Sequence, residues 1–321
     1  MAAAAQDFAG LGGAIDVHAH YITPSYRRAL VAAGHTRPDG MPAIPEWSPG
    51  SALALMDATG VATAMLSVSS PGVSFGDAAA RAALARTVNT EGAAVAAEHP
   101  GRFGLLASLP LPDVRAALAE LGYALDVLGA DGVILLTNHD GVYLGDGGFE
   151  PLMAELDRRG TVVLLHPTSP ACGERTALGF PRPMVEFLFD STRAVAELVL
   201  RRVTERYPRI RFVVPHAGAA LPVTADRIAA FARMSGTDVD VLAALRGLHY
   251  DVAGAALPRA LPALLALVAP DRLLYGSDHP FTAAPVVTSL AAALAATDAL
   301  DAAGKHMMTS GNARALFGRP A

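Results

Sequence analysis

Lysine and cysteine are almost absent from this chain of 321 residues. Lys305 is the only lysine, so any mechanism that needs a lysine in the middle of the chain is excluded. Cys172 is the only cysteine, which rules out an intramolecular disulfide and a thiolate metal cluster. The basic residues are therefore nearly all arginine.

Charge is also scarce. Charged residues make up 17% of the chain and hydrophobic residues 52%, and the net charge is −5 from 25 basic and 30 acidic residues. Nothing in this balance favours binding to nucleic acid or to an anionic membrane surface. A chain this apolar can bury a large core, so we expect order over most of its length.

Long hydrophobic runs are missing as well. The first residues, MAAAAQDFAGLGGA, have neither a positive segment nor a continuous apolar core, so they do not form a signal peptide. The most apolar later stretch, Leu257 to Ala269, is too short to span a bilayer and is interrupted by Pro258, Arg259 and Pro262. These features predict a soluble, cytoplasmic protein.

Short apolar or β-branched runs alternate along the chain with stretches rich in alanine and leucine. Eight runs are typical of buried parallel strands: Ala14–His18, Val61–Val68, Phe103–Leu109, Gly132–Leu136, Thr161–His166, Ile210–Pro215, His249–Val252 and Arg272–Gly276. The clearest helical stretches are Asp77–Glu98, Val114–Leu128, Phe149–Arg159, Met184–Tyr207, Leu221–Met234, Arg259–Val268 and Pro285–Ala296. Eight strands with intervening helices predict an α/β fold, a (β/α)8 TIM barrel.

We expect one barrel domain over residues 1–321, with a flexible N-terminus at residues 1–13. Two irregular stretches, Tyr21–Gly50 and Thr168–Pro183, form insertions after the first and fifth strands and would distort the barrel over its active-site face. The alternative is an open doubly wound sheet. That fold needs a glycine-rich phosphate loop after the first strand, and Val17-His18-Ala19-His20 is not one.

Metal-competent side chains gather at predicted strand ends. The first strand ends in His18 and His20, and residues two apart in a strand point the same way, so both face the barrel mouth. Two imidazoles on one strand can hold one ion, although a pair of core histidines is the plainer alternative. His166 ends the fifth strand, His216 follows the sixth and Asp278 follows the eighth. Active sites of this fold lie at that end, so together the five residues predict a metal site.

Other histidines fit simpler roles. His139 follows the fourth strand and is expected at the surface, although it is close enough to the mouth to touch a substrate. His279 neighbours Asp278 but should point elsewhere, because consecutive residues diverge.

Four motifs of the chain resemble those of the amidohydrolase superfamily. They lie between Ile15 and Phe281 and read IDVHAH, LLHP, VVPHAG and YGSDHPF. The resemblance is to the branch that contains aminocarboxymuconate-semialdehyde decarboxylase and the γ-resorcylate decarboxylases. Two further stretches, PEWSPGSALALMDATGVATAMLSVSSPG and YLGDGGFEPLMAELDRRG, are similar to 6-methylsalicylate decarboxylase-like members.

This resemblance implies roles for individual residues. The implied metal ligands are His18, His20, His166 and Asp278, and the implied proton-handling residues are His216 and Asp278. Arg227 matches an arginine that reaches a neighbouring subunit's active site and binds a substrate carboxylate, which implies a homodimer. We also expect Trp47 to help form an aromatic wall that binds substrate, although it could equally be a packing residue.

One metal ion is expected rather than two. Many superfamily members bridge two metals with a carboxylated lysine after the fourth strand, and here that strand ends Leu136-Thr137-Asn138. Three imidazoles and one carboxylate suit a single Zn²⁺ or Mn²⁺.

Two reactions remain open for such a site. One is non-oxidative decarboxylation of a salicylate-type hydroxyaryl acid, which makes the small-molecule partner an aromatic acid and the enzyme a carboxy-lyase. The other is hydrolysis of an amide, ester or lactone by a metal-activated water. A non-catalytic metal-binding or scaffold protein is a weaker third hypothesis.

Overall fold

A computed structural model describes residues 10–318, and eight parallel strands form its centre. In spatial order they are β1 (Ala14–His20), β2 (Val61–Ser67), β3 (Phe103–Ser108), β4 (Gly132–Leu136), β7 (Val162–His166), β8 (Arg211–Val214), β9 (His249–Asp251) and β10 (Leu273–Leu274). A bridge between Asp16 and Tyr275 joins β1 to the chain just after β10. The strands therefore close into a barrel, and the predicted (β/α)8 fold is confirmed.

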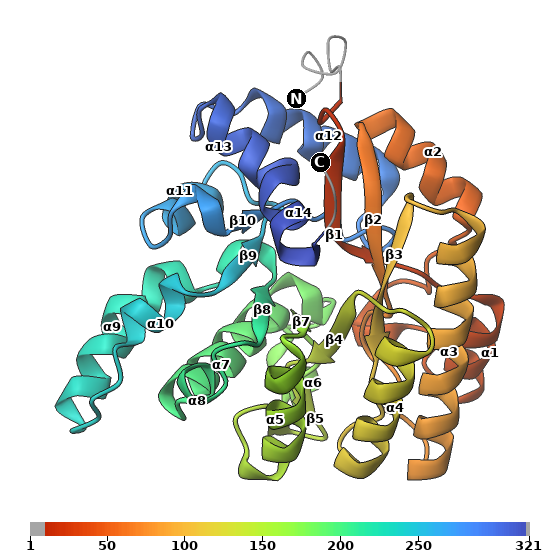
Figure 1. Cartoon of the computed structure of the whole chain (residues 1–321), viewed down its shortest axis with the longest axis horizontal. Coiled ribbons are helices and arrows are strands. Elements are labelled where there is room, and N and C mark those ends of the chain that lie inside the picture. The colour runs from red at the N-terminus through yellow and green to blue at the C-terminus, as the bar shows by residue number, and fades with distance from the viewer. Residues whose placement is uncertain (1–9, 319–321) are drawn as a thin grey trace.

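Helices surround the strands (Figure 1). They are α1 (Pro24–Ala32), α2 (Pro49–Thr59), α3 (Ala78–Glu98), α4 (Val114–Asp126), α5 (Glu150–Arg159), α6 (Gly173–Thr176), α7 (Glu186–Leu200), α8 (Val203–Arg206), α9 (Leu221–Met234), α10 (Val241–Arg246), α11 (Ala260–Leu265), α12 (Ala284–Ala296), α13 (Ala302–His306) and α14 (Asn312–Phe317). A two-stranded hairpin, β5 (Asn138–His139) with β6 (Val142–Tyr143), follows β4. Among the described residues, no helix is long and apolar enough to cross a membrane.

Local sequence signals explain where several helices begin and end. Ser48 caps α2 by accepting a hydrogen bond from the Ser51 amide, and Pro49 occupies the first helical position. The same helix ends at Gly60, which has a φ of 72° and so adopts a conformation that costs glycine little. Asp113 caps α4 in the same way as Ser48 caps α2.

Two predictions about local structure need correction. The stretch Tyr21–Gly50 is not wholly irregular, because it contains α1, which Thr23 caps and Pro24 opens. The single helix expected over Met184–Tyr207 is divided into α7 and α8, since Arg202 has a left-handed φ of 60°. The other predicted strands and helices agree with the structure to within a few residues at each boundary, whereas α2, α6, α10, α13, α14 and the β5–β6 hairpin were not predicted.

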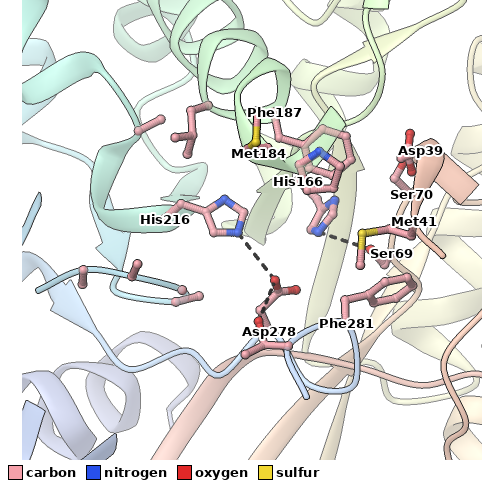
Figure 2. A pocket seen from close by; sticks show the side chains of 18 of the residues that line it. Asp39, Met41, Ser69, Ser70, His166, Met184, Phe187, His216, Asp278 and Phe281 are labelled. Atoms are coloured by element: carbon pink, nitrogen blue, oxygen red, sulfur yellow. Dashed lines mark hydrogen bonds and ion pairs between the residues drawn. The ribbon is translucent and has the colours of Figure 1, made fainter. Parts of the chain in front are cut away.

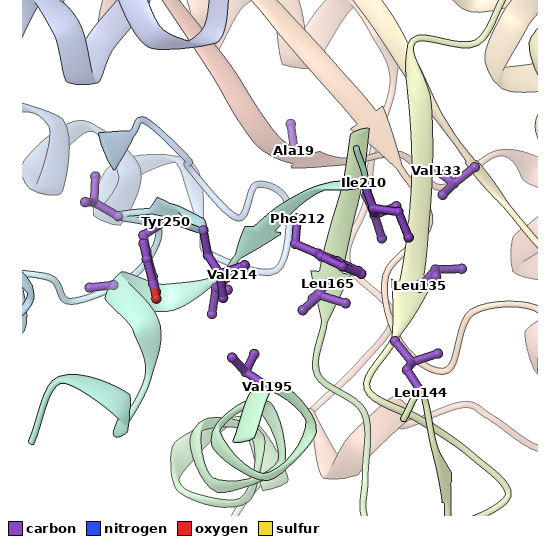
Figure 3. Packing of buried hydrophobic residues seen from close by; sticks show 14 of the residues in the cluster. Ala19, Val133, Leu135, Leu144, Leu165, Val195, Ile210, Phe212, Val214 and Tyr250 are labelled. Atoms are coloured by element: carbon purple, nitrogen blue, oxygen red, sulfur yellow. The ribbon is translucent and has the colours of Figure 1, made fainter. Parts of the chain in front are cut away.

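The core lies in two layers. Inside the barrel, Val17, Met65 and Leu164 pack with neighbouring strand residues and with Leu316 of α14. Outside it, the strands pack against the helices, as Figure 3 shows for Val195 of α7 facing Val214 of β8. Polar side chains end several of the strands, namely His20, Ser67, His166 and Asp251.

The N-terminal segment expected to be flexible falls partly outside the described residues, which begin at residue 10. Within the described part, the amide of Leu11 donates a hydrogen bond to the Thr59 carbonyl at 2.8 Å. The side chain of Leu11 is buried in the outer core layer. This short segment is therefore attached to the barrel.

Candidate metal centre and substrate pocket

Four side chains from three distant parts of the chain meet at the carboxyl ends of the strands. His18 and His20 come from β1, His166 ends β7 and Asp278 follows β10, and one ligand atom from each lies within 4.8 Å of all the others. The Nε2 atoms of His18 and His20 are 3.1 Å apart, and Asp278 Oδ1 is 3.3 Å from His20 Nε2. The structure thus brings together the four residues that the sequence singled out as metal ligands.

The other nitrogen of each imidazole is already engaged by the protein. The Nδ1 contacts are His18 with Asp251 Oδ2 at 2.9 Å, His20 with Ser67 Oγ at 2.9 Å, and His166 with the Pro167 carbonyl at 2.7 Å. Such partners fix the ring orientation and leave Nε2 free to bind a metal. The three rings are fully or almost fully buried. A set of three imidazole nitrogens and one carboxylate fits a divalent metal ion.

Asp251, at the end of β9, is a functional residue that the sequence reasoning missed. It is completely buried, its Oδ2 contacts His18, and its Oδ1 accepts hydrogen bonds from the amides of His216 and Ala253. It therefore joins a metal ligand to the His216 turn. Its position at a strand's carboxyl end was the signal available, because that rule had located the other site residues.

Electrostatics distinguish the members of the cluster. Burial lowers the pKa of His18, but the carboxylates of Asp251, Asp278 and Asp16 outweigh this and raise it to about 9. Burial lowers the pKa of both His20 and His166, so these rings are neutral. Two neutral imidazoles are thus ready as ligands, whereas His18 must lose a proton when a metal binds.

The carboxyl group of Asp278 is held in its ionised form. Burial raises its pKa, yet the nearby side chains of His20 and His216 and the charge of His18 outweigh this and hold the pKa well below the usual range. Its backbone has a φ of 57°, a left-handed conformation that is uncommon for residues other than glycine. Its amide donates to the His18 carbonyl at 2.8 Å, which locks this loop to the end of β1.

A cavity of about 370 Å³ opens above the cluster, with His166, His216 and Asp278 on its floor. Figure 2 shows Phe187 and Met184 above His166, and Phe281 beside Asp278. Several small residues complete the walls, namely Ala219, Ala253, Gly254, Ala255, Ala256 and Ala260. A floor of metal-competent groups under apolar and aromatic walls suits a small, largely apolar ligand with one polar end.

His216 lies beside the cluster rather than within it. Its Nε2 is 3.9 Å from Asp278 Oδ2, and its Nδ1 is buried without a hydrogen-bond partner among the described residues. It follows β8 in a turn with a φ of 56°. The ring therefore faces the cavity and lies within reach of a bound ligand (Figure 2).

Arg227 and Trp47 do not line this cavity. Arg227 is exposed on α9, where its guanidinium lies 4.9 Å from the ring centre of Phe231. Trp47 packs against the outer core layer and borders a separate cavity of about 20 Å³, which His20 and His279 also border. Its expected contact with substrate therefore gains no support from its position.

His139 is an exception among the other histidines, because it is buried rather than at the surface. It lies in β5, stacked edge-on to Phe149, and its Nδ1 is 3.4 Å from Ser74 Oγ. The hairpin that follows β4 folds His139 inward, which a strand-by-strand reading of the sequence could not show.

The comparisons with known proteins agree with this geometry. The profile of the amidohydrolase family matches residues 15–319, so the chain belongs to that family. The chain is 35% identical over 314 residues to 6-methylsalicylic acid decarboxylase of Penicillium expansum, covering 95% of this chain and 96% of that protein. The sequence-based resemblance to decarboxylases of this family, including 6-methylsalicylate members, is confirmed.

Solved structures share the same fold. A crystal structure described as amidohydrorolase II superposes with a TM-score of 0.92 at 39% identity, over 95% of this chain and all of that one. A dihydroxybenzoic acid decarboxylase from Polaromonas sp. JS666, solved with bound manganese, superposes with a TM-score of 0.82 at 20% identity, over 96% and 97% of the two chains. The second likeness establishes the barrel fold only.

Proposed function

We propose that the protein catalyses the metal-dependent, non-oxidative decarboxylation of a hydroxyaryl carboxylic acid of the salicylate type. It is a carboxy-lyase, as its 35% identity over nearly the full length of a 6-methylsalicylic acid decarboxylase supports. The observation that carries the proposal is the cluster of His18, His20, His166 and Asp278, of which His166 and Asp278 lie on the floor of a largely apolar cavity. An aromatic ring fits such walls, and its carboxylate end would lie at the floor.

One divalent ion, Zn²⁺ or Mn²⁺, would be held by these four residues. When bound, it supplies a Lewis acid that orients the carboxylate and the ortho oxygen of the substrate. Asp251 and Ser67 keep the rings of His18 and His20 aimed at it. Phe187 and Phe281 flank the cavity and exclude water from the ring of the substrate.

His216 is the residue best placed to move a proton. Decarboxylation of an aromatic acid requires a proton on the ring carbon that carries the carboxylate, after which carbon dioxide leaves and the ring becomes aromatic again. Because Asp278 is held ionised, it serves better as a ligand and as a partner for His216 than as the first proton donor. His216 faces the cavity and would deliver the proton.

We further propose that the working unit is a homodimer in which Arg227 serves the partner's site. Arg227 lies on a face of α9 that also exposes Val223 at 75%, Phe231 at 53% and Met234 at 78%. No arginine or lysine of the described chain lines its own cavity. An arginine from a second copy would supply the missing cation for the substrate carboxylate.

Metal analysis followed by a panel of hydroxybenzoic acids tests the proposal. We expect about one divalent ion per chain and release of carbon dioxide from a salicylate-type acid. Carbon dioxide release must stop when a chelator removes the ion and return when the ion is restored. Turnover of a lactone or an amide by the metal-loaded protein, with no carbon dioxide from any acid, would show that it is a hydrolase instead.

A further inference from the structure

A carboxylate on the outer wall of the cavity has no part in the chemistry described so far. Asp39 lies in the loop after α1 and lines the cavity together with Met41 and Ser70 (Figure 2). Apart from the histidines and Asp278 on the floor, Asp39 is the one charged side chain among the described lining residues. It forms no ion pair within 4.0 Å in the described part of the chain.

The orientation of Asp39 is fixed by a short chain of hydrogen bonds. Arg182 Nε donates to Ser169 Oγ at 2.6 Å, and the Ser169 hydroxyl donates to Asp39 Oδ1 at 2.5 Å. A guanidinium can only donate, so the serine must turn its own proton toward Asp39. The positive charge of Arg182 therefore acts on Asp39 through the hydroxyl rather than as a direct ion pair.

The backbone at Asp39 shows that this placement is specific. Its φ is 52°, within the left-handed region that most side chains avoid and that aspartate and asparagine tolerate best. The turn Pro38-Asp39-Gly40 holds it there, and Ser169 and Arg182 brace it from the other loop that borders the cavity. One oxygen of Asp39 is thus held in place at the cavity wall.

We propose that Asp39 determines substrate specificity: it admits aryl monoacids and rejects acids with a second carboxylate on the ring. This inference rests on the proposed function for the kind of substrate. The first carboxylate belongs at the metal floor, so a second one must face a wall on which Asp39 is the one charged side chain that lines the cavity, with Arg182 behind Ser169. Two carboxylates about 4 Å apart near a protein surface repel enough to weaken binding by about tenfold or more. A neutral substituent, or one that donates a hydrogen bond, meets no such penalty.

The test compares two ligands of nearly the same shape. They are a salicylate with a second carboxylate on its ring and the same compound with a carboxamide in that place. Dissociation constants for the metal-loaded protein are measured by titration calorimetry, and carbon dioxide release is measured separately. We expect the wild type to bind the amide at least about tenfold more tightly than the diacid, and the difference to shrink in high salt.

Asp39→Asn is the deciding variant, because asparagine keeps the shape and tolerates the positive φ. The preference for the amide should fall to within about threefold, while affinity for a monoacid changes little. Ser169→Ala is the matched control: it removes the brace but keeps the charge, so the preference should remain. An unchanged preference in Asp39→Asn would overturn the role of Asp39. If binding depends on the charge at residue 39 but no acid releases carbon dioxide, the role of Asp39 in specificity is supported and the proposed decarboxylation is refuted.

Discussion

The floor and the outer wall of the cavity are built by different parts of the molecule. The floor comes from strand ends, where backbone hydrogen bonds between the end of β1 and the loop after β10 fix His18 and Asp278. The outer wall comes from loop residues of two stretches, 21–50 and 168–183, which meet through the hydrogen bonds between Asp39, Ser169 and Arg182. Residues at strand ends are held rigidly enough to keep the geometry that a metal ion needs. Residues in loops can change without disturbing that metal site.

The largest effect should follow from breaking the floor. His18→Ala removes a ligand and leaves Asp251 buried without its imidazole partner, so metal and activity should both be lost. Metal content per chain and carbon dioxide release are the measurements. His35→Ala, a histidine outside the cluster, is the control and should keep both. An active His18→Ala enzyme without metal would refute the central assignment.

A smaller loss of metal affinity or activity is expected when the residue that orients His18, rather than a metal ligand itself, is changed. Asp251→Asn keeps the shape but removes the charge that orients His18, so metal affinity or activity should fall by about ten- to a hundredfold. Competition with a metal-sensitive dye gives the affinity, and steady-state kinetics gives the activity. Equal metal affinity and equal kcat in the two proteins would show that Asp251 is only a packing residue.

The Arg227→Ala variant tests whether Arg227 of one subunit contributes to substrate binding in the cavity of its partner. Activity should fall by about tenfold or more, through loss of a charge-assisted hydrogen bond to the substrate carboxylate, while metal content stays intact. Arg233→Ala, an arginine at the end of the same helix, serves as the control. Sedimentation should show a dimer for all three proteins. Unchanged kinetics in Arg227→Ala would exclude the arginine from the site.

The smallest effect on activity is expected at His139, away from both floor and wall. Burial lowers its pKa to about 4, from about 6.5 when exposed, so the unfolded chain binds a proton that the folded chain does not. The contribution of neutral His139 to the free energy of unfolding is fully present above pH 6.5. It is lost as the pH falls toward 4, which lowers the free energy of unfolding by about 3 kcal/mol.

Urea unfolding at pH 7 and at pH 4.5 measures this contribution. His139→Gln should lose less stability between the two pH values than the wild type does, because the wild type alone protonates this side chain on unfolding. Activity at pH 7 should change only slightly. Identical pH dependence in the two proteins would show that His139 is accessible to protons in the folded state.

The difference between floor and wall also explains what the sequence could predict. The sequence predicted the four metal ligands because each lies at or just after the carboxyl end of a strand, and the carboxyl ends of all strands in this fold meet at one end of the barrel. Strand periodicity also showed that His18 and His20 point the same way. Asp39 was not found, since its position depends on a turn with positive φ and on contacts with Ser169, which lies far away along the chain. Likewise, the burial of His139 depends on a hairpin whose strands have only two residues each.

The joining of β1 to the loop after β10 has a consequence for how the protein folds. His18 and its partner Asp251 are 233 positions apart, so the metal site exists only after nearly the whole ring of strands has assembled. An ion bound there joins the two ends of the barrel and stabilises the closed ring over every opened form, by a free energy that grows with the logarithm of the ion concentration. Removing it should therefore loosen first the seam between β1 and β10, which hydrogen exchange at the amides of Val17 and Asp278 would register.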